Sequence, residues 1–102
     1  MITAHGELDR TELPALRVAI QNVLDQSAPA LILDMAEVTY IDSSVLAALI
    51  AESLDADRRG KTLVVATGAG GIMRSLELKG LVQVMHIADS VDAAAADLAP
   101  PS

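Results

Sequence analysis

The chain has 102 residues and a net charge of −7, with 7 Lys and Arg against 14 Asp and Glu. This acidic balance argues against nucleic acids and anionic membranes as partners, because both attract basic surfaces. The absence of Cys excludes disulfides and Cys-ligated metals, and a single Tyr without Phe or Trp excludes an aromatic platform for bases. We expect one cytoplasmic domain over residues 1–99 and a disordered tail over 100–102.

The first third of the chain predicts a strand, a helix and a second strand. Residues 1–4 are expected to be extended. Residues 11–26 carry apolar side chains at steps of three and four, which is typical of a helix, and Thr11 is its expected N-cap. Residues 30–34 form a short apolar run that favours a strand buried on both faces. Residues 35–42 are expected to be a connection with a brief extended segment.

The same alternation continues to the end of the chain. The further segments that we expect are a helix at 43–59, a strand at 62–66, a turn at 68–71, a helix at 72–79, a strand at 82–87 and a helix after Ser90. Alternation of strands and helices gives a sheet with crossover helices. The predicted fold is therefore α/β, with a mixed, mainly parallel sheet of about four strands packed against about four helices.

Motifs for catalysis and for cofactor binding are incomplete. The Gly-rich segment 67–71 lies between a strand and a helix, but Met73 stands where a dinucleotide fingerprint needs Gly. His5 and His86 are isolated, so we expect no metal site. Asp34 ends a strand as a receiver-domain aspartate would, but the acidic pair after the first strand is missing. We expect no enzyme activity and no cofactor.

The start of the second long helix is the remaining candidate site. Asp42, Ser43 and Ser44 place a carboxylate and two hydroxyls there. One interpretation is a helix cap, in which Asp42 or Ser43 accepts hydrogen bonds from the first turn. The other is a phosphoacceptor hydroxyl, since a helix N-terminus favours a phosphate group. The residues alone leave both interpretations open.

Five segments, in order along the chain, resemble motifs of the STAS domain family, and in particular of bacterial anti-sigma factor antagonists. The motifs that they resemble are G-E-L-D at 6–9, D-L-x-x-V at 34–38 with Met35 in place of Leu, the start of D-S-[ST]-G-L at 42–44, G-x-x-L at 60–63 and L-x-x-x-G-L at 76–81. Each motif is short, but their order and spacing agree with the alternation of strands and helices. The resemblance covers nearly the whole chain.

The resemblance implies a regulatory binding protein that acts on transcription indirectly. In the antagonists, the Ser after the Asp is phosphorylated by an anti-sigma factor that is itself a kinase of the histidine-kinase-like ATPase fold. That Ser corresponds to Ser43, with Ser44 as the alternate. The unphosphorylated form binds the kinase, and a phosphatase resets the phosphorylated form. The residues expected to bind the partner are Asp9, Asp34, Asp42, Ser43, Ser44 and Val45.

Two features depart from the family pattern. Val45 stands where the family has Gly, and its β-branched side chain is expected to add bulk where the kinase docks. The chain begins five residues before Gly6, so the first strand is expected to be short and to leave a sheet edge open to a weak homodimer. Two alternatives stay open. One is a STAS accessory subunit of a lipid-transport ABC complex in a membrane, and the other is a sensor domain for a small ligand.

Overall fold

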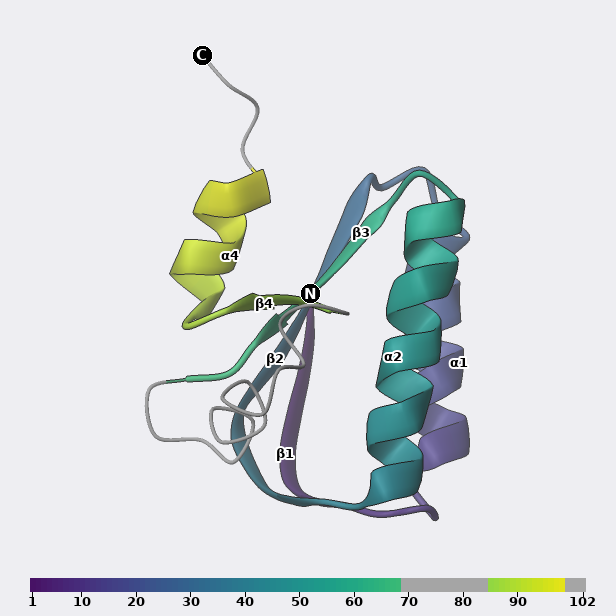
Figure 1. Ribbon diagram of the computed structural model, residues 1–102, viewed down its shortest axis with the longest axis vertical. Helices are drawn as coiled ribbons and strands as arrows, with labels where there is room; N and C mark the ends of the chain where they lie inside the picture. The colour runs from purple at the N-terminus through teal and green to yellow at the C-terminus, as the bar shows by residue number, and fades with distance from the viewer. Residues whose placement is uncertain (69–84, 99–102) are drawn as a thin grey trace.

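The computed structural model describes residues 1–68 and 85–98 (Figure 1). Its elements are β1 (Ile2–Leu8), α1 (Leu13–Leu24), β2 (Ala30–Ile41), α2 (Ser43–Arg58), β3 (Thr62–Ala66), β4 (His86–Ala88) and α4 (Val91–Leu98). The predicted alternation is confirmed over these residues. The predicted helix at 72–79, most of the turn at 68–71, the first residues of the last strand and the tail lie outside the described residues.

The four strands form one sheet in the order β1-β2-β3-β4. Every neighbouring pair is parallel, so the predicted mixed, mainly parallel sheet is entirely parallel within the described part of the chain. In β2, Leu33 lies opposite Ile2 on one side and Val65 on the other. Consecutive parallel strands need crossovers that return the chain to the same end of the sheet. The ends of β1 and β2 therefore meet at one edge.

The two faces of the sheet carry cores of different size. Helices α1 and α2 cover one face together, and α4 lies on the opposite side (Figure 1). The larger core joins buried residues of β1, α1, β2, α2 and β3, including Ile20, Leu33, Leu49 and Val65. The smaller core centres on Ala94 of α4 and on buried residues of β3 and β4. The apolar stripes of α1 and α2 thus fix both helices above the sheet.

Polar contacts between the two helices complete this packing. Glu52 of α2 is only 4% exposed, and its carboxylate accepts a hydrogen bond from Arg17 Nε of α1 at 3.2 Å. At the other end, the Arg59 guanidinium donates to Asp25 Oδ1 at 2.7 Å and to the Leu24 carbonyl at 2.8 Å. The pKa of Arg59 is raised because the Asp25 carboxylate stabilises its charged form. These contacts hold α2, and the site at its start, in a fixed position.

Strand β2 is longer than the apolar run predicted. It continues through residues 35–41, which we expected to be a connection with a brief extended segment. Residues 30–34 of β2 pair with β3 and residues 33–41 pair with β1, so only Leu33 and Asp34 have partners on both sides. Side chains beyond this overlap, such as Glu37 and Tyr40, are exposed. Because this part of the strand is partly exposed, it carries no continuous apolar run. The predicted strand therefore stopped at residue 34, seven residues before the observed end.

Strand β1 also extends beyond its predicted end. It continues through Gly6 to Leu8, whereas only residues 1–4 were expected to be extended. Gly6 has a φ of 75°, and the pairing with β2 shifts register between Gly6 and Glu7. A glycine with positive φ at a β-bulge lets the strand bend and continue. The expectation of a short first strand is therefore wrong.

Of the three helices that the structure describes, two begin at a residue that the sequence indicated. Ser90 caps α4, with its Oγ accepting from Ala93 N at 3.0 Å. Asp42 caps α2, as one interpretation proposed. Thr11 does not cap α1, which begins after Glu12 without a side-chain cap. The Thr11 hydroxyl donates instead to Asp9 Oδ1, a hydrogen bond within the loop before α1.

Candidate functional site

The candidate site lies where β1 and β2 end, at the lower edge in Figure 1. Leu8 and Ile41 are opposite each other in the last register position of the two strands. Asp42 N donates to the Leu8 carbonyl at 3.1 Å, which joins the end of β1 to the start of α2. The loop at 9–12 and the first turn of α2 are therefore neighbours.

One oxygen of Asp42 caps α2. Its Oδ1 accepts from Ser44 N at 3.0 Å, from Val45 N at 3.1 Å and from Ser44 Oγ at 2.6 Å. The Ser44 hydroxyl, followed by the Val45 N–H, lowers the pKa of Asp42 because both donors stabilise the carboxylate. The carboxylate thus satisfies donors that a helix start leaves without an intrahelical partner.

The other oxygen of Asp42 holds the loop. Its Oδ2 accepts from Arg10 N at 3.0 Å. Within the loop, Asp9 Oδ1 accepts from Thr11 N at 2.9 Å and from the Thr11 hydroxyl. That hydroxyl is the main reason why the pKa of Asp9 is lowered. Asp9 and Asp42 are therefore carboxylates, and both lie at the edge of the sheet beside α2.

The two serines differ in accessibility. Ser43 is the first residue of α2 and is exposed. Ser44 is half-buried, and its hydroxyl donates its proton to Asp42 Oδ1. Within residues 1–68 and 85–98, the Ser43 hydroxyl makes no hydrogen bond. Ser43 therefore offers the more accessible nucleophilic oxygen.

Val45 and Asp34 are placed differently from the sequence-based expectation. Val45 is 0% exposed and packs in the larger core. Its side chain adds no bulk to the surface, so it cannot obstruct a docking kinase in the way proposed. Asp34 lies in the middle of β2, opposite Thr3 and Ala66, and its Oδ1 accepts from Ala36 N at 3.1 Å. The structure brings Asp9, Asp42, Ser43 and Ser44 together, without Asp34.

Two exposed residues at this edge were missed by the sequence analysis. Tyr40, the single aromatic residue of the chain, is 47% exposed and lies opposite Glu7. Arg10 is exposed in the loop that Asp42 holds. In the sequence, Arg10 follows the motif at 6–9 and Tyr40 precedes the motif at 42–44, which was the only indication of a role. Their place at the site became clear only from the length of β2 and from the hydrogen bond between the loop at 9–12 and Asp42.

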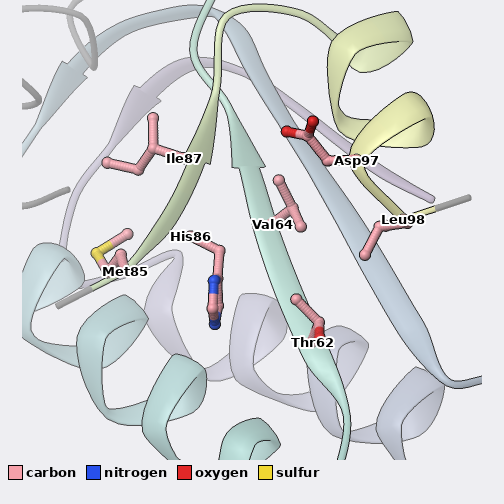
Figure 2. Close-up of a pocket in the computed structure, with 7 residues that line it drawn as sticks. All are labelled: Thr62, Val64, Met85, His86, Ile87, Asp97 and Leu98. Carbon is pink, nitrogen blue, oxygen red and sulfur yellow. The ribbon is translucent and has the colours of Figure 1, made fainter. Parts of the chain in front are cut away.

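A pocket lies away from this edge of the sheet. The pocket, about 420 Å³ in volume, opens between β3, β4 and α4, and Figure 2 shows the side chains around it. Its lining residues are Thr62, Val64, Met85, His86, Ile87, Asp97 and Leu98. His86 Nε2 lies 3.1 Å from Asp57 Oδ1 of α2, so the imidazole is held by a carboxylate outside this lining. Its lining mixes apolar side chains with the polar groups of Thr62, His86 and Asp97.

None of the helices in residues 1–68 and 85–98 has the length and apolar character needed to cross a membrane. The same residues contain no group of three or more His, Asp or Glu side chains that could hold a metal ion.

Comparison with known proteins identifies the family. A family model described as "Mlab, STAS domain" matches residues 1–96. The chain belongs to the STAS domain family. This STAS domain is also similar to a solved structure, an anti-sigma factor antagonist from Mycobacterium paratuberculosis. The two share 27% sequence identity with a TM-score of 0.79, over 94% of this chain and 81% of the other. The resemblance found in the sequence and the predicted fold class are thereby confirmed.

Proposed function

We propose that this STAS domain is an anti-sigma factor antagonist controlled by phosphorylation of Ser43. It would bind an anti-sigma factor through the edge formed by the loop at 9–12 and the start of α2, and so regulate transcription indirectly. The observation that carries the proposal is the exposed Ser43 hydroxyl at the first position of α2. The similarity to a solved antagonist supports the same assignment.

The geometry favours Ser43 over Ser44 as the phosphoacceptor. In the proposed reaction, Ser43 Oγ attacks the γ-phosphorus of ATP held by the kinase. The bond from that phosphorus to the bridging oxygen breaks, ADP leaves, and the hydroxyl proton passes to a base on the kinase. Ser44 is less suited, because its hydroxyl donates to Asp42 and its side chain is half-buried.

The charges around Ser43 explain how the phosphate would release the partner. Phosphorylation adds about −1.5 to −2 charge at neutral pH. Asp42 already accepts the N–H groups of Ser44 and Val45, so these donors are not free to neutralise the phosphate. The new charge joins an edge that already carries Asp9 and Asp42. A partner whose surface matches the unmodified edge then meets a desolvation cost and, at its own acidic groups, repulsion.

Phosphosite mapping tests this function. The chain is incubated with the purified anti-sigma factor kinase and ATP, and the modified residue is located by mass spectrometry. We expect one phosphate on Ser43 in the wild type and in Ser44→Ala, and none in Ser43→Ala. A phosphate that persists in Ser43→Ala would assign the reaction to another residue.

A second candidate is an accessory subunit that binds the ATPase of a lipid-transport complex without being phosphorylated. The observation that favours it is the cap of α2, because Asp42 alone orders the first turn and no phosphate is required there. Capture with the whole chain, followed by identification of the bound protein, separates the two. A kinase-fold anti-sigma factor supports the first candidate, and a transporter ATPase supports the second.

A further inference from the structure

Arg10 is a cation on an acidic edge, and its side chain has no partner among the residues that the structure describes. Most basic side chains of the described residues are engaged: Arg17 binds Glu52, Arg59 binds Asp25, and Lys61 donates to the carbonyls of Leu24 and Gln26. Within residues 1–68 and 85–98, only Arg10 and Arg58 make no side-chain hydrogen bond or ion pair. Of these two, Arg10 is the one in the loop that contacts Asp42, the cap of α2.

The backbone of Arg10 is fixed close to Ser43. Arg10 N donates to Asp42 Oδ2 at 3.0 Å, and Asp42 N donates to the Leu8 carbonyl at 3.1 Å. Ser43 follows Asp42 directly, with Cα atoms about 3.8 Å apart as in any trans peptide. The contact with Asp42 uses only the backbone N–H of Arg10, and within the described residues the long side chain makes no hydrogen bond or ion pair of its own. Ser43 therefore lies within reach of the Arg10 guanidinium.

We propose that Arg10 binds the phosphoryl group of phosphorylated Ser43. The inference rests on the proposed function, and it names the residue of this chain that binds the phosphate once Ser43 carries it. A guanidinium presents paired N–H donors that match two phosphate oxygens, which gives a strong charge-assisted contact. The phosphate needs such a donor, because Asp42 occupies the N–H groups of Ser44 and Val45.

The pairing has a consequence for the partner. In the unmodified protein, Arg10 is exposed and available to an acidic group of the partner. After phosphorylation, the same guanidinium is held by the phosphate. One modification thus changes two side chains of the edge at once: it adds charge at Ser43 and removes the free cation at Arg10.

Titration of the phosphate tests the inference without a kinase. Phosphoserine is incorporated at position 43 during translation, and its second pKa, about 6 when unperturbed, is measured by phosphorus NMR. We expect Arg10→Gln to raise this pKa by about 0.5, which is roughly a threefold tighter binding of the proton. Arg10→Lys, which keeps the charge but loses the paired donors, should give an intermediate value.

The matched control is Arg58→Gln, which removes the other free cation. Arg58 lies about 22 Å along α2 from Ser43 at 1.5 Å per residue, so its loss should leave the phosphate pKa unchanged. The nearby carboxylates of Asp9, Glu12 and Asp42 are expected to raise the phosphate pKa equally in every variant. The difference in phosphate pKa between the wild type and Arg10→Gln therefore measures the effect of Arg10 alone. Circular dichroism confirms that each variant is folded.

Equal phosphate pKa values in the wild type and Arg10→Gln would overturn the inference. This result is independent of the kinase, because the phosphate is installed during translation. If Arg10 shifts the pKa but the kinase leaves Ser43 unmodified, the proposed function fails and the pairing stands. If the kinase modifies Ser43 but Arg10 shifts nothing, the pairing fails and the function stands.

Discussion

At the scale of single residues, Asp42 connects the site. Its carboxylate accepts from two backbone N–H groups and one hydroxyl of α2, and from the Arg10 N–H of the neighbouring loop. A carboxylate with several donors is favoured in its charged form. Asp42 thus both begins the helix and fixes the loop beside Ser43, so its protonation should loosen both segments.

The first prediction concerns pH and Asp42. Because its folded-state pKa is lowered, its contribution to stability is present above the unfolded value near 3.8 and is lost as the pH falls through the folded value. We expect Asp42→Ala to lower the urea midpoint at pH 7, and Asp42→Asn to lower it less, because the amide oxygen can still cap. The gap between wild type and Asp42→Ala should narrow below pH 4. A gap of constant size down to pH 2 would contradict this account.

The second prediction concerns Val45. Because its side chain is fully buried, Val45→Ala should cost roughly 2 kcal/mol of unfolding free energy, and Val45→Gly about 3 kcal/mol. The control is Ala47→Gly at an exposed position of α2, which should cost about 1 kcal/mol from helix propensity alone. Urea unfolding measures all three. If Val45→Gly costs no more than Ala47→Gly, Val45 does not support the core.

The structure also changes what Val45 should do to phosphorylation. The sequence suggested that this side chain hinders the kinase, but its burial removes that physical basis. We expect the initial rate of Ser43 phosphorylation to be equal in the wild type and Val45→Gly under conditions where both are folded. A faster rate in Val45→Gly would restore the original interpretation.

Residue-level prediction from the sequence succeeded where chemistry is local. A cap at the start of α2 was expected from residue type and position, with Asp42 or Ser43 as the candidates, and the structure selects Asp42. Asp34 and Val45 required three-dimensional information. The motif order suggested that Asp34 flanks the site, but the length of β2 separates them. The side to which Val45 points depends on how α2 sits on the sheet.

At the scale of elements, the segment after β3 packs closely against the long strand β2. Gly68 follows β3 with a φ of 73°, and a Cβ added there would lie 2.7 Å from Ala36 Cβ of β2. The Gly68 N–H donates to the carbonyl of Asp89 at 2.8 Å, and Asp89 lies in the short segment between β4 and α4. The absence of a side chain at Gly68 therefore lets three segments of the chain meet.

The third prediction compares two glycines with similar backbone angles. Gly60 has a φ of 72° and open space around it, so Gly60→Ala should cost only the left-handed conformation, about 1 kcal/mol. Gly68→Ala adds the clash with Ala36 and should cost roughly 2–4 kcal/mol in total. Thermal or urea unfolding measures both. Equal costs for the two variants would show that the contact at Ala36 relaxes freely.

Some of these strands and helices could be predicted from apolar patterns in the sequence, and others could not. The apolar stripes of α1 and α2 and the short runs of β2 and β3 were recognised because each faces a core on at least one side. The second half of β2 and the end of β1 were not recognised, because they pair mainly with each other and stay partly exposed. Strands at the edge of a sheet pair through backbone hydrogen bonds, which require no particular side chains and are therefore hard to recognise in a sequence.

At the scale of the whole molecule, the fourth prediction concerns self-association. β1 is at one end of the strand order and pairs only with β2 among the described strands. An open edge can recruit a second chain, but the two register shifts along β1 bend it and weaken such pairing. The net charge of −7 adds repulsion that salt screens. We therefore expect a weak homodimer that strengthens with salt.

Sedimentation equilibrium over a roughly hundredfold range of concentration measures this association. The apparent mass should rise with concentration, and more steeply at high salt. A constant monomer mass at both salt concentrations would show that the bends in β1 are sufficient to protect the edge.

The central claim is that the charge state of Ser43 decides whether the partner binds. Calorimetric titration of the anti-sigma factor with unmodified protein and with protein carrying phosphoserine at position 43 tests it most directly. Ser43→Ala should bind like the wild type, since the hydroxyl is exposed and makes no contact within the described residues. We predict that phosphoserine weakens binding at least about tenfold, with Ser43→Asp weaker than wild type by a smaller factor. Equal affinity of the unmodified and the phosphorylated protein would contradict the account.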